Sequence, residues 1–228
     1  MKITYHGHSA IQIEIGSHVI QVDPFITGNA IAESVVSADE LEADTILLTH
    51  AHGDHWGDTP AIAKRTGATV VANYEITTYL GREHQYDNTV GMNIGGSWEL
   101  AWGKVKQTVA RHSSSFPDGT YGGNPNGYLL WAEDKCLYLA GDTDRFPDMQ
   151  WIGDDNQIDI AFLPIGDCFT MGPAEAARAV EMLRPALAVP IHFNTFPAIE
   201  TDADAWVEDL GRRGFKGRVM APGETIEL

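Results

Sequence analysis

Residues 49–58 read THAHGDHWGD, and they follow the apolar run TILL of residues 45–48. An almost continuous apolar run predicts a strand that is buried on both faces of a sheet and is followed by a loop. The loop of residues 50–58 holds three histidines and two aspartates in nine positions. A purely structural loop rarely carries so many imidazoles and carboxylates, so this stretch predicts a metal site at the end of a buried strand.

The spacing within this loop indicates two metals. His50 and His52 are two residues apart, so both side chains project to the same side of an extended chain and can bind one ion. Gly53 allows a tight turn, which lets Asp54 and His55 face a second ion beside the first. The motif therefore predicts both halves of a dinuclear centre.

Three further candidate ligands each follow a predicted strand, at residues 104–110, 136–140 and 187–191: His112, Asp142 and His192. Taken singly, each of these residues could equally be an ordinary turn aspartate or strand-end histidine instead of a metal ligand. Their shared placement favours metal ligation, because side chains at the ends of separate strands can converge. A carboxylate at position 142 can bridge two cations, since divalent metals accept oxygen ligands.

The remaining pattern predicts more strands than helices. Further strands are expected at residues 3–5, 11–15, 19–22, 45–49, 68–72, 128–132, 158–163, 217–221 and 225–228. Helices are expected at residues 60–67 and 173–183, and a third begins near position 201 or 202. The Gly- and Pro-rich stretches 91–96 and 116–127 are interpreted as functional loops. Two packed sheets with helices outside follow from this order, with the polar strand ends on one edge.

Length and composition agree with one ordinary globular domain spanning residues 1–228. The start of the chain, MKITYH, lacks the apolar stretch of a secretory signal, and no window resembles a membrane span. We therefore expect a cytoplasmic protein with no membrane partner. Cys136 and Cys168 have no CxxC spacing, so each is expected to be a small core residue without a catalytic role.

The order His-x-His-x-Asp-His, with the later histidines and aspartate, resembles the metallo-β-lactamase superfamily. Within it, the chain is similar to the small bacterial metal-dependent hydrolases whose relatives include the ascorbate-phosphate lactonase. The resemblance covers essentially the whole chain and includes the segments YHGHS (5–9), DPF (23–25), GDT (141–143) and PIHFN (190–194). It implies an α/β fold, the four-layer αβ/βα sandwich, with the site at the edge between the sheets. It also implies one metal on His50, His52 and His112, another on Asp54, His55 and His192, and Asp142 as the bridge.

Two divalent metal ions would lower the pKa of a shared water and hold a bridging hydroxide for attack on the scissile group. Asp54 is the candidate catalytic residue, because it would orient the hydroxide and take its proton as the intermediate collapses. We expect hydrolysis of a small ester, lactone or phosphoester. Zinc is the first candidate metal, and manganese, nickel and iron stay open because imidazole binds all four.

Three more residues are candidates for contacts with substrate or with the ligand side chains. His8 can point to the same face as His6, and Asp23 can accept a hydrogen bond from a ligand imidazole. Asn194 can contact substrate. Simple alternatives remain for each of them, namely loop packing for His8 and ordinary turn positions for the aspartate and the asparagine.

Two other functions compete with hydrolysis of a small molecule. A phosphodiesterase or nuclease is disfavoured by the net charge of −17 and by the lack of a Lys/Arg cluster, so no nucleic-acid partner is expected. The third possibility is a non-catalytic metal-binding or redox module. In the di-iron redox members of the superfamily that the chain resembles, the ligands of the second metal are changed and a flavin domain is appended. This function is disfavoured because His55 is intact here and the sequence ends at Leu228. The oligomeric state stays open, and a homo-oligomer is compatible with the sequence.

Overall fold

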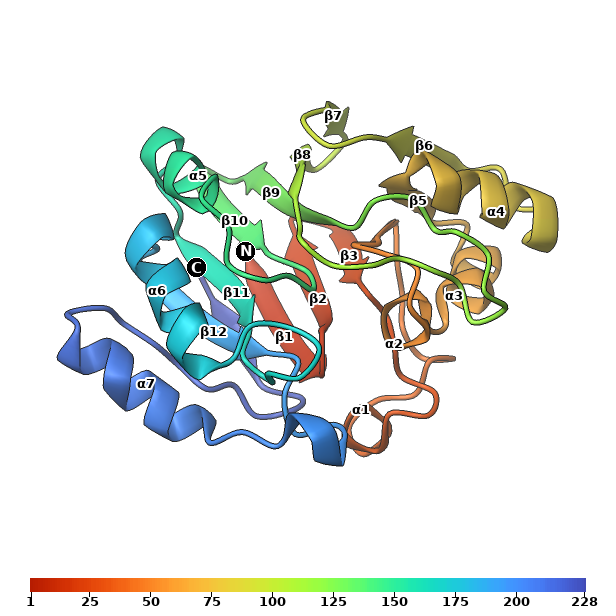
Figure 1. Cartoon of the computed structure of the whole chain (residues 1–228). Helices are drawn as coiled ribbons and strands as arrows, with labels where there is room; N and C mark the ends of the chain where they lie inside the picture. Colours follow the sequence, from red (N-terminus) through yellow and green to blue (C-terminus); the bar gives the residue numbers. More distant parts are fainter.

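Two β-sheets face each other in the computed structural model, which describes residues 1–228 (Figure 1). The seven-stranded sheet has the order β13-β1-β2-β3-β4-β5-β6, and the six-stranded sheet has the order β12-β11-β10-β9-β8-β7. The first sheet contains β1 (Lys2–Gly7), β2 (Ala10–Ile15), β3 (His18–Val22), β4 (Thr45–Leu47), β5 (Thr69–Asn73), β6 (Thr89–Met92) and β13 (Thr225–Glu227). The second contains β7 (Ser97–Leu100), β8 (Gly103–Val109), β9 (Asn126–Ala132), β10 (Lys135–Leu139), β11 (Ile160–Pro164) and β12 (Leu187–Ile191).

Both sheets are mixed. Strands β1, β2 and β3 form an antiparallel meander, and β3 to β6 then run parallel to one another. In the second sheet β7 to β10 are antiparallel, whereas β10, β11 and β12 are parallel. The parallel strands β4 and β11 are buried along their whole length, as expected for strands covered on both faces. The carboxyl end of β4 opens onto the loop that carries His50, His52, Asp54 and His55.

Helices cover the outer face of each sheet, which gives four layers. The helices α1 (Ala30–Glu33), α2 (Gly53–Trp56), α3 (Thr59–Thr66) and α4 (Tyr74–His84) lie on the side of the first sheet, and α5 (Met149–Asp155), α6 (Pro173–Leu183) and α7 (Ala203–Arg212) lie on the side of the second (Figure 1). One apolar cluster joins the sheets through residues such as Ile13, Leu47 and Phe162. Two further clusters lie beneath the two helical layers. The four-layer sandwich expected from the sequence is therefore confirmed.

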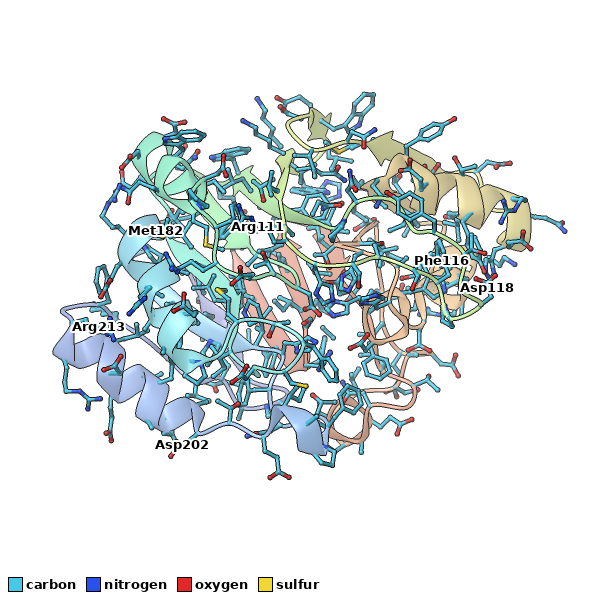
Figure 2. The ribbon with its side chains drawn as sticks, in the orientation of Figure 1. Arg111, Phe116, Asp118, Met182, Asp202 and Arg213 are labelled. Carbon is cyan, nitrogen blue, oxygen red and sulfur yellow. The ribbon has the colours of Figure 1, made fainter.

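Local signals account for the helices that the sequence predicts. Helix α6 occupies the expected residues, with Pro173 in its first turn and its alanine face buried. Asp202 caps α7, because its side chain accepts a hydrogen bond of 2.9 Å from the Ala205 amide. The labelled residues Asp202 and Arg213 lie at opposite ends of this helix in Figure 2. None of the helices is long and apolar enough to cross a membrane.

The expected strand at residues 217–221 is wrong. Only Gly217 bridges Ala188, after which the chain leaves the second sheet and crosses to pair β13 with β1 in the first. The interpretation of residues 91–96 as a functional loop is also wrong in part, because Gly91 and Met92 belong to β6. Strands β6 and β7 were missed because they are four-residue edge strands without a clear apolar alternation.

Helices α4 and α5 are absent from the predicted elements. The sequence of α4 contains two threonines and a glycine, which are weak helix formers. The helix forms because Asn73 caps it, accepting a hydrogen bond of 2.9 Å from the Ile76 amide, and because Ile76 and Leu80 are buried beneath it. Packing and capping therefore override a weak local propensity at this position.

Candidate metal centre

The loops at one edge of the two sheets bring the seven candidate ligands together. His50, His52, Asp54 and His55 follow β4, whereas His112 follows β8, Asp142 follows β10 and His192 follows β12. Their donor atoms form three overlapping groups, each with all of its donor atoms within 4.8 Å of one another. Because both sheets end at this edge, residues that are far apart in the chain share one site.

The first group consists of His50, His52 and His112. His52 Nδ1 lies 3.0 Å from His50 Nε2 and 3.2 Å from His112 Nε2. The outer nitrogens have other partners: His50 Nδ1 is 3.0 Å from Thr49 Oγ1, and His52 Nε2 is 3.3 Å from Ser113 Oγ. Hydrogen bonds on the outer nitrogens leave the inner lone pairs directed at a common point, as a metal requires.

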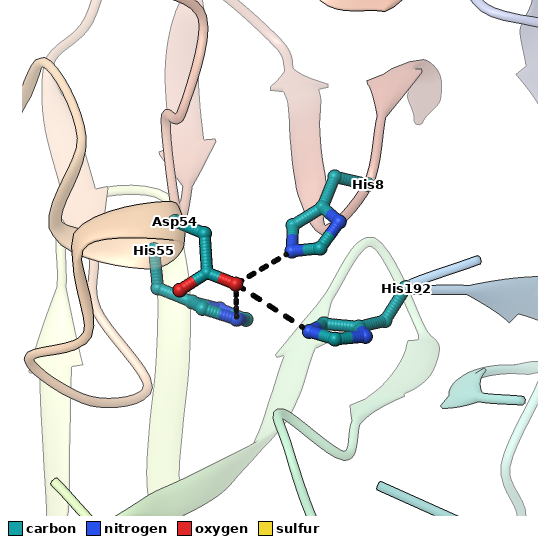
Figure 3. Close-up of side chains that lie close together, drawn as sticks. All are labelled: His8, Asp54, His55 and His192. Carbon is teal, nitrogen blue, oxygen red and sulfur yellow. Dashed lines mark hydrogen bonds and ion pairs between the residues drawn. The ribbon is translucent and has the colours of Figure 1, made fainter. Parts of the chain in front are cut away.

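The second group contains Asp54, His55 and His192, together with His8 (Figure 3). Asp54 Oδ2 lies 3.1 Å from His8 Nε2, 3.6 Å from His192 Nε2 and 4.0 Å from His55 Nε2. Asp54 is partly exposed, whereas the three imidazoles are buried. The four side chains come from the β1–β2 turn, helix α2 and the end of β12, so they meet only in the folded chain.

Asp142 lies between the two groups. Its carboxylate oxygens are 3.0 Å from His192 Nε2 and 3.3 Å from His55 Nε2 on one side. On the other side they are 3.5 Å from His112 Nε2 and 3.9 Å from His50 Nε2. The side chain of Asp142 is only 2% exposed. One buried carboxylate therefore faces ring nitrogens of both groups.

The donor atoms at this centre fit a metal better than they fit one another. His55 Nε2, both ring nitrogens of His192 and Asp142 Oδ1 are buried without a hydrogen-bond partner. The short distances between His192 and Asp142 lack the angles of a hydrogen bond. A buried polar atom without a partner costs about 1–3 kcal/mol, and a divalent cation would use most of these lone pairs. The residue set is therefore suited to metal ions.

Asp23 orients two of the candidate ligands through hydrogen bonds. Its Oδ2 accepts hydrogen bonds from His55 Nδ1 at 2.8 Å and from Thr49 Oγ1 at 2.6 Å, and its Oδ1 accepts one from the Thr49 amide at 2.8 Å. Since the Thr49 hydroxyl donates its hydrogen to Asp23, it accepts a hydrogen bond from His50 Nδ1. Asp23 thus sets the ring orientation of one ligand directly and of another through Thr49.

Charge is concentrated in the second group. Burial disfavours the charged form of His192, but Asp142 outweighs it and raises the pKa of that imidazole to about 9. Burial also opposes the ionisation of Asp142, yet His192 and His55 hold the pKa of its carboxyl well below its usual range. For Asp54, the interactions with His192 and His8 outweigh burial, so its pKa is also well below its usual value. Both carboxylates are therefore ionised at neutral pH.

The histidines of the first group are neutral. Burial, followed by the proximity of His55, lowers the pKa of His50 well below its ordinary value. Burial also lowers the pKa of His52 and of His112. Neutral imidazoles are the form that binds metal, so this group is ready to accept an ion without losing protons.

His8 and Asn194 occupy different environments. His8 is buried, with its Nδ1 2.9 Å from Thr195 Oγ1 and its Nε2 facing Asp54. Asn194 is exposed, and its side chain accepts a hydrogen bond of 2.7 Å from the Thr201 amide, which closes a turn. Both residues have positive φ angles, 58° in each case. The structure brings His8 into the centre and gives Asn194 a contact within its own loop.

A cavity of about 460 Å³ opens over the centre. It is lined by His52, Asp54, His112, Ser113, Asp142, Cys168, Phe169 and His192. The expectation that Cys168 is a core residue is wrong, because it is exposed in a turn where Asp167 and Cys168 both have positive φ and the Asp167 carboxylate accepts a hydrogen bond from the Cys168 amide. Cys136 is buried, as expected.

The predicted loop 116–127 ends at residue 125, because Asn126 and Gly127 belong to β9, and it supports the centre rather than lining this cavity. Ser114 Oγ accepts a hydrogen bond of 3.2 Å from the Ala51 amide and donates to the Gly122 carbonyl at 3.0 Å. A Cβ on Gly122 would lie 2.3 Å from that of Ala51, so only glycine fits there. The labelled Phe116 in Figure 2 stacks on Tyr79 of α4 with centroids 3.6 Å apart. The loop thus braces the segment between His50 and His52.

Four residues of the site were missed from the sequence: Thr49, Ser113, Thr195 and Phe169. Thr49 and Ser113 are the sequence neighbours of the candidate ligands His50 and His112, and this adjacency could have predicted that they contact the ligand side chains. Thr195 and Phe169 lie in loops whose path depends on the tertiary fold, so their roles leave no local pattern. Three of the four missed residues carry a hydroxyl group that contacts a histidine of the site.

Comparison with known proteins agrees with this geometry. Residues 18–193 match the family model described as the beta-lactamase superfamily domain. The chain belongs to this family. It is 52% identical to the UPF0173 metal-dependent hydrolase of Shouchella clausii (strain KSM-K16) and 50% identical to the UPF0173 metal-dependent hydrolase YtkL of Bacillus subtilis (strain 168), and each match covers 100% of both chains.

A solved structure supports the same assignment. The metallo hydrolase Igni18 from the hyperthermophilic archaeon Ignicoccus hospitalis has 38% sequence identity and a TM-score of 0.90, over 100% of this chain and 98% of that one. This chain is therefore a metal-dependent hydrolase of the metallo-β-lactamase superfamily, and its histidine and aspartate cluster can hold metal ions.

Proposed function

We propose that this hydrolase cleaves a small ester, lactone or phosphoester at a centre of two divalent metal ions. Zinc is the first candidate metal, with manganese, nickel and iron as alternatives. The observation that carries the proposal is the position of Asp142, a buried carboxylate within 3.9 Å of ring nitrogens from both groups of ligands. A carboxylate in this position is suited to bridging two ions.

Two bound ions would supply Lewis acidity, which lowers the pKa of water and stabilises negative charge on the substrate. The protein's own contribution centres on Asp54. Its Oδ2 faces the imidazoles of the second group, and its Oδ1 is free of hydrogen bonds within the protein. Because the pKa of Asp54 is held low, the carboxylate stays ionised and can orient an attacking water through Oδ1.

The cavity favours an uncharged substrate among the three classes. None of the eight lining residues is Lys or Arg, so apart from the metal ions a phosphate group would find no positive charge there. Phe169 is 53% exposed at the mouth and offers an apolar contact. This lining supports a small ester or lactone as the substrate, and the net charge of −17 disfavours a nucleic-acid partner. A cytoplasmic location without a membrane partner is part of the same proposal.

The test is the metal content of the protein purified without a metal-affinity tag, measured by plasma mass spectrometry. We expect about two equivalents per chain in the unaltered protein and fewer in Asp142→Ala. Asp44→Ala is the matched control, because Asp44 is an exposed aspartate whose carboxylate contacts only the Val19 amide and His18 and lies outside the ligand groups. Its metal content should equal that of the unaltered chain.

The same measurement selects the metal for a substrate screen. The loaded protein is assayed with series of lactones, carboxylic esters and phosphoesters, and hydrolysis of the uncharged compounds should be fastest. Fewer than half an equivalent of metal, unchanged after supplying zinc, manganese, iron and nickel, would overturn the two-metal proposal. Faster hydrolysis of phosphoesters would overturn the substrate preference alone.

A further inference from the structure

His8 is placed among the ligands of the second group. Its Nε2 lies 3.1 Å from Asp54 Oδ2, and it belongs to the group of donor atoms that includes His55 and His192 (Figure 3). The imidazole has no exposed surface. Adjacent ligand atoms on a four-coordinate zinc ion are about 3.4 Å apart, given bonds of about 2.1 Å. The distances from Asp54 Oδ2 to the imidazoles of His8 and His192 are close to that value.

The hydrogen bonds of His8 point to a free lone pair on Nε2. Its Nδ1 is 2.9 Å from Thr195 Oγ1, and the Thr195 hydroxyl donates to the Phe193 carbonyl at 3.4 Å. When the hydroxyl donates to that carbonyl, it accepts a hydrogen bond from His8 Nδ1, and this tautomer leaves Nε2 unprotonated in the neutral ring. An unprotonated nitrogen then faces a carboxylate oxygen at 3.1 Å, and two such atoms repel each other unless a cation lies beside them.

The same arrangement occurs at two of the other histidines. His50 Nδ1 donates to Thr49 Oγ1 and His55 Nδ1 donates to Asp23 Oδ2, so both rings turn Nε2 toward the centre. His8 uses Thr195 as His50 uses Thr49. Hydrogen bonding of the outer nitrogen is the usual support of a metal-bound imidazole.

The surrounding structure holds His8 in this position. Its backbone has a φ of 58°, which is unfavourable for a residue with a side chain. Its carbonyl accepts hydrogen bonds from the His192 amide at 2.8 Å and from the Tyr5 hydroxyl at 3.2 Å. The rings of Phe25 and Phe196 pack edge-on against the imidazole, with centroids 5.8 and 5.5 Å away. Backbone and packing thus prevent the ring from turning out of the centre.

We propose that His8 is an additional protein ligand of the second metal site, beside Asp54, His55 and His192. This inference rests on the proposed two-metal centre. With His8 in place, the second site is enclosed by buried imidazoles, whereas the first keeps the less buried His52 and His112 at the cavity.

The test is titration of the metal-stripped chain with cobalt(II), followed by the visible absorption of the bound ion and by calorimetry. The variant is His8→Gln, whose side chain is polar and of similar reach but is a poor cobalt ligand. The matched control is His6→Gln, because His6 is a buried histidine on β1, two residues before His8, and belongs to no ligand group. We expect the control to bind two equivalents like the unaltered chain.

If His8 is a ligand, His8→Gln binds one equivalent normally and the other at least about 10-fold more weakly, with an altered absorption spectrum. Two equivalents bound by His8→Gln with unchanged affinity and spectrum would overturn the inference and leave the two-metal centre intact. Failure of the unaltered chain to bind a second equivalent would overturn both proposals.

A second measurement needs no variant. In the proton NMR spectrum of the di-cobalt protein, each ligand histidine contributes a strongly shifted, exchangeable N–H signal. His50, His52, His55, His112 and His192 would give five such signals, and His8 would add one more from its Nδ1–H. Six signals support the inference, and five would contradict it even if the variant did not fold.

Discussion

Asp23 and His55 are joined by a hydrogen bond of 2.8 Å, in which His55 Nδ1 donates to Asp23 Oδ2. Both side chains are buried, and the same carboxylate holds Thr49, which in turn accepts a hydrogen bond from His50. One aspartate thus orients a candidate ligand from each of the two groups. The backbone of Asp23 has a φ of 43°, so the turn that places the carboxylate is itself strained.

Replacing Asp23 by Asn should therefore weaken metal binding at both sites. We expect the affinity to fall about 10- to 100-fold, because the partner that fixes the ring orientation is lost. Competition with a fluorescent chelator measures the affinity. Asp58→Asn is the control, since Asp58 holds the same turn through the Ile26 and Thr27 amides without contacting a ligand. An equal loss in both variants would contradict the specific role of Asp23.

Metal binding should release protons. In the metal-free protein Asp142 raises the pKa of His192 from 6.5 to about 9, so this imidazole is protonated at neutral pH and must lose its proton to bind an ion. Apparent affinity should therefore increase as the pH rises toward 9. Calorimetry in buffers of different ionisation enthalpy counts the released protons. Binding at pH 7.5 without proton release would contradict this prediction.

The stability of the metal-free chain should depend on the same titration of His192. It should decrease as the pH rises, whereas the metal affinity increases. Because the pKa of His192 is raised in the folded state, its stabilising contribution is fully present below pH 6.5 and is lost as the pH rises through about 9. Melting temperature of the chelated protein should decline over that interval. The protein loaded with metal should lack this decline, and a decline of equal size in both forms would assign it to other groups.

The two cysteines should differ in reactivity. Cys136 is buried, and burial together with Asp159 raises the pKa of its thiol to about 12, whereas Cys168 is exposed at the cavity. A thiol reagent should label one cysteine in the folded protein and both in denaturant. A bulky maleimide on Cys168 should block hydrolysis, and Cys168→Ser should be active and insensitive. Labelling of Cys136 at the same rate would contradict the structure.

Gly166→Ala should disturb the second metal site. A Cβ at this position would lie 2.2 Å from the His192 carbonyl oxygen, so the strand end that carries the ligand must shift. We expect a loss of stability of about 1–3 kcal/mol by denaturant unfolding and weaker binding of one equivalent of metal. Gly211→Ala is the control, because nothing lies within 4 Å of its Cβ, and it should stabilise α7 by up to about 1 kcal/mol.

The strands and helices whose signals lie within a few neighbouring residues could be predicted from the sequence. The buried run before His50, the helix that begins at Pro173 and the strand that ends before His192 each carry their own signal in apolar spacing and end residues. Resemblance to a family added the sandwich and grouped the ligands. The sequence by itself thus determined the class of fold, the main elements and the candidates for metal binding.

The tertiary structure decided what depends on the path of the chain between those elements. Thr195 lies 187 residues from His8 in the chain and is still its hydrogen-bond partner. The exposure of Cys168 results from a turn with two positive φ angles, and the edge strand β7 is held by its pairing with β8 rather than by its own apolar pattern. Such contacts join residues that no local pattern relates, because burial and pairing energies are shared across the whole fold.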